Sequence, residues 1–117
     1  MGQPVVHFEI AGRDYRKSIA FYRNLFDWTI EEVGAFPYGM VQAAGERAIG
    51  GGISPVAPGG RPGVTVYVMV DDLQTYLERA QQLGGKTVTP PSPIPGIGEF
   101  AMFADPDGNV IGLFKAK

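Results

Sequence analysis

The order of the predicted elements repeats once along the chain, and this repeat constrains the fold more than any other feature. An apolar, alternating strand at residues 5–10 is followed by a helix at 14–26 and by three short strands. After residues 54–63 the same order begins again, with a strand at 64–70, a helix and three more strands. Each half is therefore a βαβββ module, and the sequence predicts one α+β domain over residues 1–117.

Hydrophobic periodicity defines the first module, residues 5–53. Alternation along its first strand places His7 and Glu9 on one face and the apolar residues on the other. Asp14 is the expected N-cap of the helix. The three short strands are expected at residues 28–32, 38–43 and 48–53. The aromatic side chains predicted to form core and module-interface packing are Phe21, Tyr22, Phe26 and Trp28.

The second module, residues 64–114, follows a linker at 54–63 whose proline and glycine content neither helix nor sheet is expected to tolerate. Asp71 and Gln74 resemble a capping box at the start of its helix. Gly84 is the expected C-cap residue. The predicted buried stripe of this helix is Leu73, Leu77, Ala80 and Leu83. The strands are expected at residues 86–89, 99–104 and 109–114.

Two segments between the last strands are predicted to be irregular. Residues 90–98 are rich in proline and glycine, and we expect a long loop that is either a lid over a ligand site or an ordinary connector. Residues 105–108, Asp-Pro-Asp-Gly, predict a hairpin turn. Asp105 and Asp107 are therefore expected to be structural rather than a catalytic pair of carboxylates.

Composition excludes several classes of function. Ten Lys and Arg residues stand against twelve Asp and Glu, so the net charge of −2 offers no field for steering toward nucleic acid or an anionic membrane. The absence of cysteine excludes a disulfide framework, a thiolate metal site and a cysteine nucleophile. The chain shows neither a signal-peptide pattern nor an apolar run of about 18 residues. We expect a cytoplasmic protein without nucleic-acid or membrane partners.

Four stretches of the sequence point to a known family. They are His-Phe-Glu-Ile at 7–10, Ala-Phe-Tyr-Arg-Asn-Leu-Phe-Asp-Trp at 20–28, Val-Asp-Asp-Leu at 70–73 and Phe-Ala-Asp-Pro-Asp-Gly-Asn at 103–109. In these stretches the chain resembles the vicinal-oxygen-chelate superfamily of glyoxalases, bleomycin-resistance proteins and extradiol dioxygenases. The resemblance implies two modules that form a cupped mixed sheet, often completed by a homodimer partner, with the site inside the cup.

The resemblance also implies where a metal would be held. Family members that use a metal place one ligand on the first and one on the last strand of each module. These positions are His7, Gly50, Thr65 and Gly112 here. Glycine has no side chain, and a threonine hydroxyl is a poor ligand for zinc, nickel or iron. We expect no bound metal; the alternative is a divalent metal held by His7, with Glu9 as a second ligand.

The remaining candidate residues lie on the two first strands. His7 is either a general base or a hydrogen-bonded wall residue, since its side chain titrates near neutrality. Glu9 either moves a proton or pairs with a surface arginine. Tyr67 and Met69 share a face with Thr65 and either line a ligand-binding wall or form plain core. His7 and Glu9 are the catalytic candidates, and all five residues, with Gly50 and Gly112, are the ligand-binding candidates.

The glycine run at 50–52 does not predict a phosphate-binding loop, because no Lys-Ser/Thr pair follows it. Glycines inside a strand are more typical of a bulge or of the close approach of a ligand or a second backbone.

Three classes of function remain, in order of preference. The first is a protein that binds a small organic molecule in its cup without a metal, as bleomycin-resistance relatives do. The second is a metal-dependent lyase, isomerase or dioxygenase that uses His7. The third is an interaction module with a vestigial cup.

Overall fold

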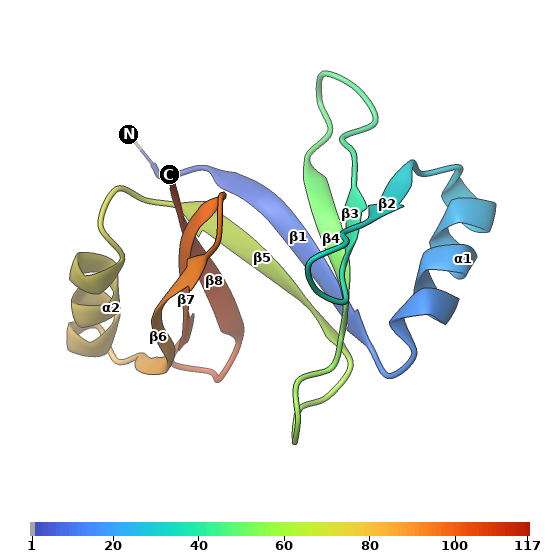
Figure 1. Cartoon of the computed structure of the whole chain (residues 1–117). Coiled ribbons are helices and arrows are strands. Elements are labelled where there is room, and N and C mark those ends of the chain that lie inside the picture. Colours follow the sequence, from blue (N-terminus) through green and yellow to red (C-terminus); the bar gives the residue numbers. More distant parts are fainter. Residues whose placement is uncertain (1) are drawn as a thin grey trace. The chain divides into compact units, whose positions relative to one another are not determined.

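The computed structural model describes residues 2–117, which contain two helices and eight strands (Figure 1). They divide into two compact units. The first unit is His7–Val64, and the second unit is Thr65–Lys117 together with the residues up to Val6. The N-terminal residues belong to the second unit, where the amide of Met69 donates to the carbonyl of Pro4 (2.9 Å). Neither helix within residues 2–117 is long and apolar enough to cross a membrane.

The first unit packs one helix against one face of a four-stranded sheet. Its elements are β1 (Val5–Gly12), α1 (Tyr15–Phe26), β2 (Ile30–Glu32), β3 (Gly39–Val41) and β4 (Gly50–Pro55). The strand order is β2-β3-β4-β1, and only β1 and β4 run parallel. The buried core residues between helix and sheet are Ile19, Ile30, Val41 and Ile53. Asp14 caps α1 as predicted, because its carboxylate accepts from the amide of Lys17 (3.2 Å).

The glycine run of β4 is required by aromatic side chains on both faces of the sheet. A Cβ on Gly51 would lie 2.5 Å from the ring of Phe8, which packs toward the helix. A Cβ on Gly52 would overlap the hydroxyl of Tyr38 on the opposite face. Successive residues of a strand point to opposite faces, so adjacent glycines admit one ring on each side.

The second unit repeats this topology. Its elements are β5 (Gly63–Met69), α2 (Leu73–Gln82), β6 (Lys86–Ile94), β7 (Gly98–Ala104) and β8 (Val110–Ala116). The strand order is β5-β8-β7-β6, with β5 parallel to β8. The buried core residues are Val70, Leu73, Leu77, Ala101 and Leu113. As in the first unit, a ring rests on a glycine: Tyr67 occupies the space that a Cβ on Gly112 would need.

The capping box predicted at Asp71 and Gln74 is wrong. Asp72 is the N-cap, since its backbone is extended and its carboxylate accepts from the amide of Thr75 (3.1 Å). The side-chain amide of Gln74 instead donates to the carboxylate of Glu78, one turn further along the helix (3.2 Å). The C-cap itself is Leu83, one residue before the predicted glycine. The predicted positive φ at the helix end is confirmed at Gly84, which follows the C-cap with a φ of +102°.

Three side chains predicted to be buried are exposed. Leu83 is 81% exposed because α2 ends at Gln82 and the C-cap residue leaves the buried stripe. Phe21 and Phe26 are 58% and 54% exposed on α1. Tyr22 and Trp28 do pack against the core, with ring centroids 5.3 Å apart.

The predicted loop at residues 90–98 is also wrong. β6 continues through its prolines to Ile94, and β7 starts at Gly98, so the segment is a hairpin and not a lid. The prolines are tolerated because β6 is an edge strand whose register shifts twice against β7. In the same way, β4 runs to Pro55, two residues into the predicted linker, and proline is tolerated there as the last strand residue.

The hairpin turn at residues 105–108 is confirmed. One carboxylate oxygen of Asp105 accepts from the amides of Asp107 and Asn109, and the other accepts from the Asn109 side chain. Gly108 supplies the positive φ of +91°. These bonds, the one from the Asn109 side chain first, hold the pKa of Asp105 below its usual range.

Gly51→Ala is expected to destabilise the protein by about 1–3 kcal/mol, because the added methyl group overlaps the Phe8 ring inside a packed layer. Urea unfolding followed by circular dichroism measures the change. Gly34→Ala is the matched control, since a Cβ there meets nothing within 4 Å. Equal stability of the two variants would contradict the contact between Phe8 and Gly51.

Candidate ligand-binding site

Three polar side chains of the first unit meet on the face of the sheet opposite α1. His7 and Glu9 come from β1, and Tyr38 immediately precedes β3. The Tyr38 hydroxyl lies 2.8 Å from His7 Nε2 and donates to Glu9 Oε2 at 3.1 Å. All three side chains are half-buried. We call them the polar cluster.

The register of the sheet explains how these side chains meet. Gly52 of β4 pairs with Glu9 on one side and with Met40 on the other. Because Gly52 carries no side chain, Tyr38 extends across β4 from the β3 side and reaches the two β1 side chains. The glycine run is a paired strand, and its function in this unit is to let aromatic rings approach the backbone.

The two hydrogen bonds of Tyr38 indicate how protons are arranged in the polar cluster. A phenol has one proton, and the Tyr38 hydroxyl gives that proton to Glu9. We therefore assign the proton of neutral His7 to Nε2, which donates to the Tyr38 oxygen, and leave Nδ1 as an acceptor. Burial lowers the pKa of His7 below its usual value, which favours this neutral form. The result is a chain of donors that ends on a carboxylate.

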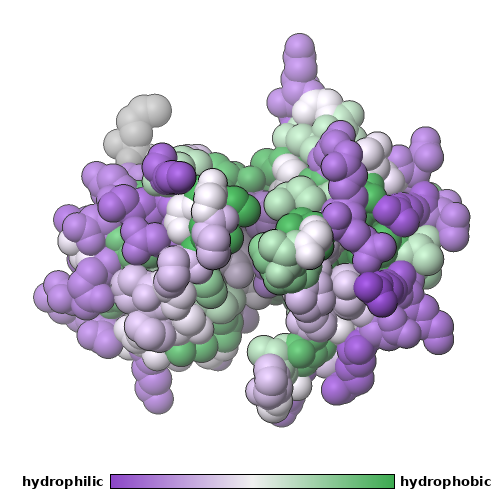
Figure 2. All heavy atoms as spheres, in the orientation of Figure 1, coloured by the Kyte–Doolittle hydropathy of each residue, from purple (hydrophilic) through white to green (hydrophobic). Residues whose placement is uncertain are grey.

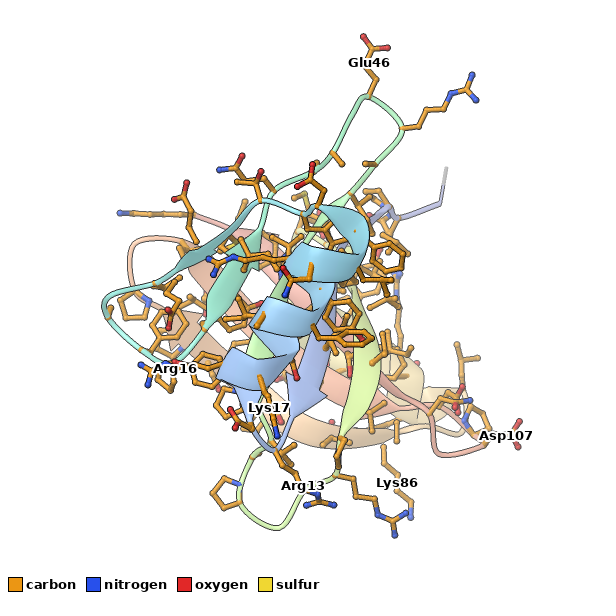
Figure 3. The ribbon with its side chains drawn as sticks, turned by 90° about the vertical axis from the view of Figure 1, so that its right-hand side faces the viewer. Arg13, Arg16, Lys17, Glu46, Lys86 and Asp107 are labelled. Atoms are coloured by element: carbon orange, nitrogen blue, oxygen red, sulfur yellow. The ribbon has the colours of Figure 1, made fainter. Side chains whose placement is uncertain are left out.

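Several charged side chains of the first unit lie on its outer surface (Figure 3). Figure 3 shows Arg16 and Lys17 on the outer surface of α1 and Glu46 at the tip of the β3–β4 loop, all pointing away from the ribbon. Arg16 pairs with Glu32 at 3.2 Å, but both side chains are exposed, so this ion pair adds little stability.

The predicted site residues fall into both units. His7, Glu9 and Gly50 belong to the first unit, where His7 pairs with Gly50 across the parallel strands. The others, Thr65, Tyr67, Met69 and Gly112, belong to the second unit. That the two groups line one cup stays a prediction.

The strand register refines the comparison between the modules. Gly112 pairs with Tyr67, just as Gly50 pairs with His7. Tyr67 is therefore the counterpart of His7 by register, and Thr65 lies two residues earlier on the same face. Tyr67 is buried, whereas Thr65 and Met69 are half-buried.

Tyr38 is the residue that the sequence analysis missed. It was expected only as the first residue of a strand, and β3 is too short for its alternation to show which way the ring points. The available signal was the glycine run, since a strand glycine requires something to approach closely.

The donor set of the polar cluster does not fit a resident divalent metal. No group of three His, Cys, Asp or Glu side chains that could hold an ion occurs within residues 2–117. The cluster offers one imidazole and one carboxylate, and its third group is a phenol already hydrogen-bonded to both. Protein zinc and iron sites use three or more imidazole, carboxylate or thiolate ligands.

Comparison with known protein families shows which family the chain belongs to. A family model described as the Glyoxalase/Bleomycin resistance protein/Dioxygenase superfamily matches residues 5–113. The chain therefore belongs to this superfamily, which confirms the family and the α+β fold predicted from the sequence.

The individual relatives have modest sequence identity to this chain. CFP32 of Mycobacterium tuberculosis, provisionally named a glyoxylase, is 32% identical over 100 residues, which cover 84% of this chain and 38% of that protein. The anthracycline biosynthesis protein DnrV of Streptomyces peucetius is 30% identical over 124 aligned positions, which cover 92% of this chain and 45% of that protein. The chain thus spans less than half the length of these relatives. The crystal structure of methylmalonyl-CoA epimerase from Mycobacterium tuberculosis has a TM-score of 0.71 at 16% identity, covering 97% of this chain and 87% of that one. That likeness shows the fold alone.

The His7 resonance is expected to titrate with a midpoint below 6.5, because burial lowers its pKa. As the pH falls through 6.5, the unfolded chain takes up a proton before the folded chain does, so the free energy of unfolding decreases. His7→Gln is expected to remove this part of the pH dependence. The chain has a single histidine, so its Cε1 proton can be followed by NMR without ambiguity. A midpoint at or above 6.5 would contradict the buried, neutral imidazole.

Proposed function

We propose that the protein binds a small organic molecule at the polar cluster, without a resident divalent metal. The observation that carries this proposal is the Tyr38 hydroxyl held between His7 and Glu9 over a strand that has no side chains at that point. Small-molecule sites typically combine a few precisely placed polar groups with otherwise apolar walls. Membership of the superfamily supports the same class of function.

The charge of the polar cluster indicates the chemistry of the ligand. Burial favours neutral His7, so the acidic side chain of Glu9 is the one group of the cluster that can bear a charge, and its oxygens are acceptors beside one hydroxyl. A neutral molecule with a hydroxyl group can donate to this carboxylate, whereas an anion would be repelled by it. A neutral, hydroxylated organic molecule is therefore the ligand class that we propose.

Elemental analysis of untagged protein, before and after chelation, tests the metal-free part of the proposal. We expect far less than one transition-metal ion per chain, because the cluster lacks a third metal-binding side chain. His7→Ala is measured in parallel. Near-stoichiometric metal that is lost in this variant would overturn the proposal and favour a metal-dependent lyase, isomerase or dioxygenase.

Thermal-shift screening with neutral hydroxylated compounds tests the ligand-binding part. Tyr38→Phe is expected to weaken the binding of any such ligand by about tenfold, the loss of one or two hydrogen bonds. Tyr15→Phe, a half-buried tyrosine outside the cluster, is the matched control. Ligand binding that is unaffected in Tyr38→Phe would place the site elsewhere.

A homodimer is also part of the proposal. Its support is the set of apolar side chains exposed on α1, where Phe21, Leu25 and Phe26 are each more than half exposed. A cytoplasmic location and the lack of nucleic-acid or membrane partners stay predictions from the sequence.

Phe21→Glu combined with Leu25→Glu is expected to convert a dimer to monomer, because two charges would have to be desolvated at the interface. Sedimentation velocity measures the change. Ile97→Glu, on an exposed turn of the second unit, is the control. A wild-type protein that sediments as a monomer would contradict the homodimer.

A further inference from the structure

An apolar cavity of about 510 Å³, open to solvent on one side, lies in the second unit between the C-terminal half of α2 and the sheet. Figure 1 shows α2 beside the strands of this unit. The sheet contributes Val68, Phe103 and Leu113 to its wall. The helix and the residue after it contribute Tyr76, Ala80 and Leu83. Ligand pockets typically enclose about 300–1,000 Å³, so this volume suits a small molecule.

The internal repeat explains why the second unit has this cavity. The N-caps Asp14 and Asp72 align the two helices, and at the same spacing Tyr22 corresponds to Ala80 and Phe26 to Gly84. In the first unit these two rings pack with Trp28, at centroid distances of 5.3 Å and 5.2 Å from it. Tyr22, Phe26 and Trp28 thus form one ring cluster at the end of α1, with Phe26 on its exposed side.

The second unit has no rings at these positions. Trp28 corresponds to Lys86, which is exposed and points away from the ribbon in Figure 3. At these three positions the second unit thus carries an alanine, a glycine and an outward-pointing lysine, whereas the first unit carries three aromatic side chains. Where the first unit has three packed rings, the second unit therefore has an apolar pocket that is open to solvent.

One basic and one acidic side chain line the cavity, Arg79 and Asp105. Arg79 lines it, with its guanidinium 5.3 Å from the centroid of the Tyr76 ring. Arg79 has no ion pair within the described part of the chain, residues 2–117. Asp105 also lines the cavity, but both of its carboxylate oxygens accept hydrogen bonds within the 105–109 turn. Asp105 keeps its negative charge, because these bonds lower its pKa, but its oxygens are already engaged. Arg79 is therefore the charged side chain of the lining whose hydrogen-bond donors face a ligand.

We propose that this cavity binds a small apolar carboxylate, with its ring or branched alkyl body against Ala80 and Val68 and its carboxylate on Arg79. A guanidinium forms directional, charge-assisted hydrogen bonds with a carboxylate. The inference is independent of the function proposed above, because every cavity residue belongs to the second unit and the polar cluster belongs to the first. It also concerns an anion, whereas the polar cluster favours a neutral molecule.

Titration with 4-phenylbutyrate, followed by amide and methyl NMR shifts, tests the charge requirement. We expect saturable shifts at Val68, Ala80 and Leu83, and about tenfold weaker binding in Arg79→Gln. The alcohol 4-phenylbutan-1-ol is expected to bind more weakly and to be insensitive to Arg79→Gln. Arg47→Gln, an exposed arginine in the first unit, is the matched control.

Ala80→Tyr tests the cavity itself, because it restores the ring that Tyr22 supplies in the first unit. We expect this variant to lose 4-phenylbutyrate binding, while Ala20→Tyr, at an exposed position of α1, leaves binding unchanged. Leu83→Asp is a second variant that does not disturb the core, since Leu83 is 81% exposed. Its carboxylate at the cavity is expected to weaken binding at least tenfold.

Three results would overturn the inference. The first is the absence of saturable shifts up to about 10 mM ligand, well above the Kd expected for a ligand of this size. The second is binding that survives both Ala80→Tyr and Leu83→Asp. The third is a set of shifts confined to the polar cluster, which would assign the anion to the first unit and contradict the ligand class proposed there as well.

Discussion

Both units depend on an aromatic ring that rests on a glycine of the neighbouring parallel strand. Phe8 lies on Gly51 in the first unit, and Tyr67 lies on Gly112 in the second. In β4 the next glycine admits Tyr38 on the other face, so one short glycine run supports both the helix-facing core and the polar cluster. The geometry of the candidate site therefore follows from the packing of the fold, because Phe8 and Tyr38 pack on opposite faces of the same strand.

The parts of the fold that sequence patterns predict are those governed by local chemistry. The N-cap at Asp14, the positive φ at Gly84 and the turn after Asp105 each depend on a few neighbouring residues. Alternation along β1 likewise predicts that His7 and Glu9 share a face, which their common contact with Tyr38 confirms. These features need no knowledge of which strands pair.

The parts that the sequence does not predict depend on tertiary context. Tyr38 reaches the site only because β4 lies between β3 and β1, and a three-residue strand has too little alternation to reveal this. Asp71 and Asp72 offer the same cap chemistry, so only the start of the helix distinguishes them. Pro90 and Pro91 predict a break in the chain, but an edge strand with shifted register tolerates them.

The proline content of β6 has a consequence for the behaviour of this protein at high concentration. Three of the nine β6 residues are prolines, Pro90, Pro91 and Pro93, and β6 forms one edge of its sheet. An unpaired edge normally offers a row of amide donors that can recruit a strand from another chain. Prolines carry no N–H, so the row of amide donors along β6 is interrupted, which disfavours the addition of a strand from another chain. The prolines of β6 thus protect this edge of the sheet against edge-to-edge aggregation.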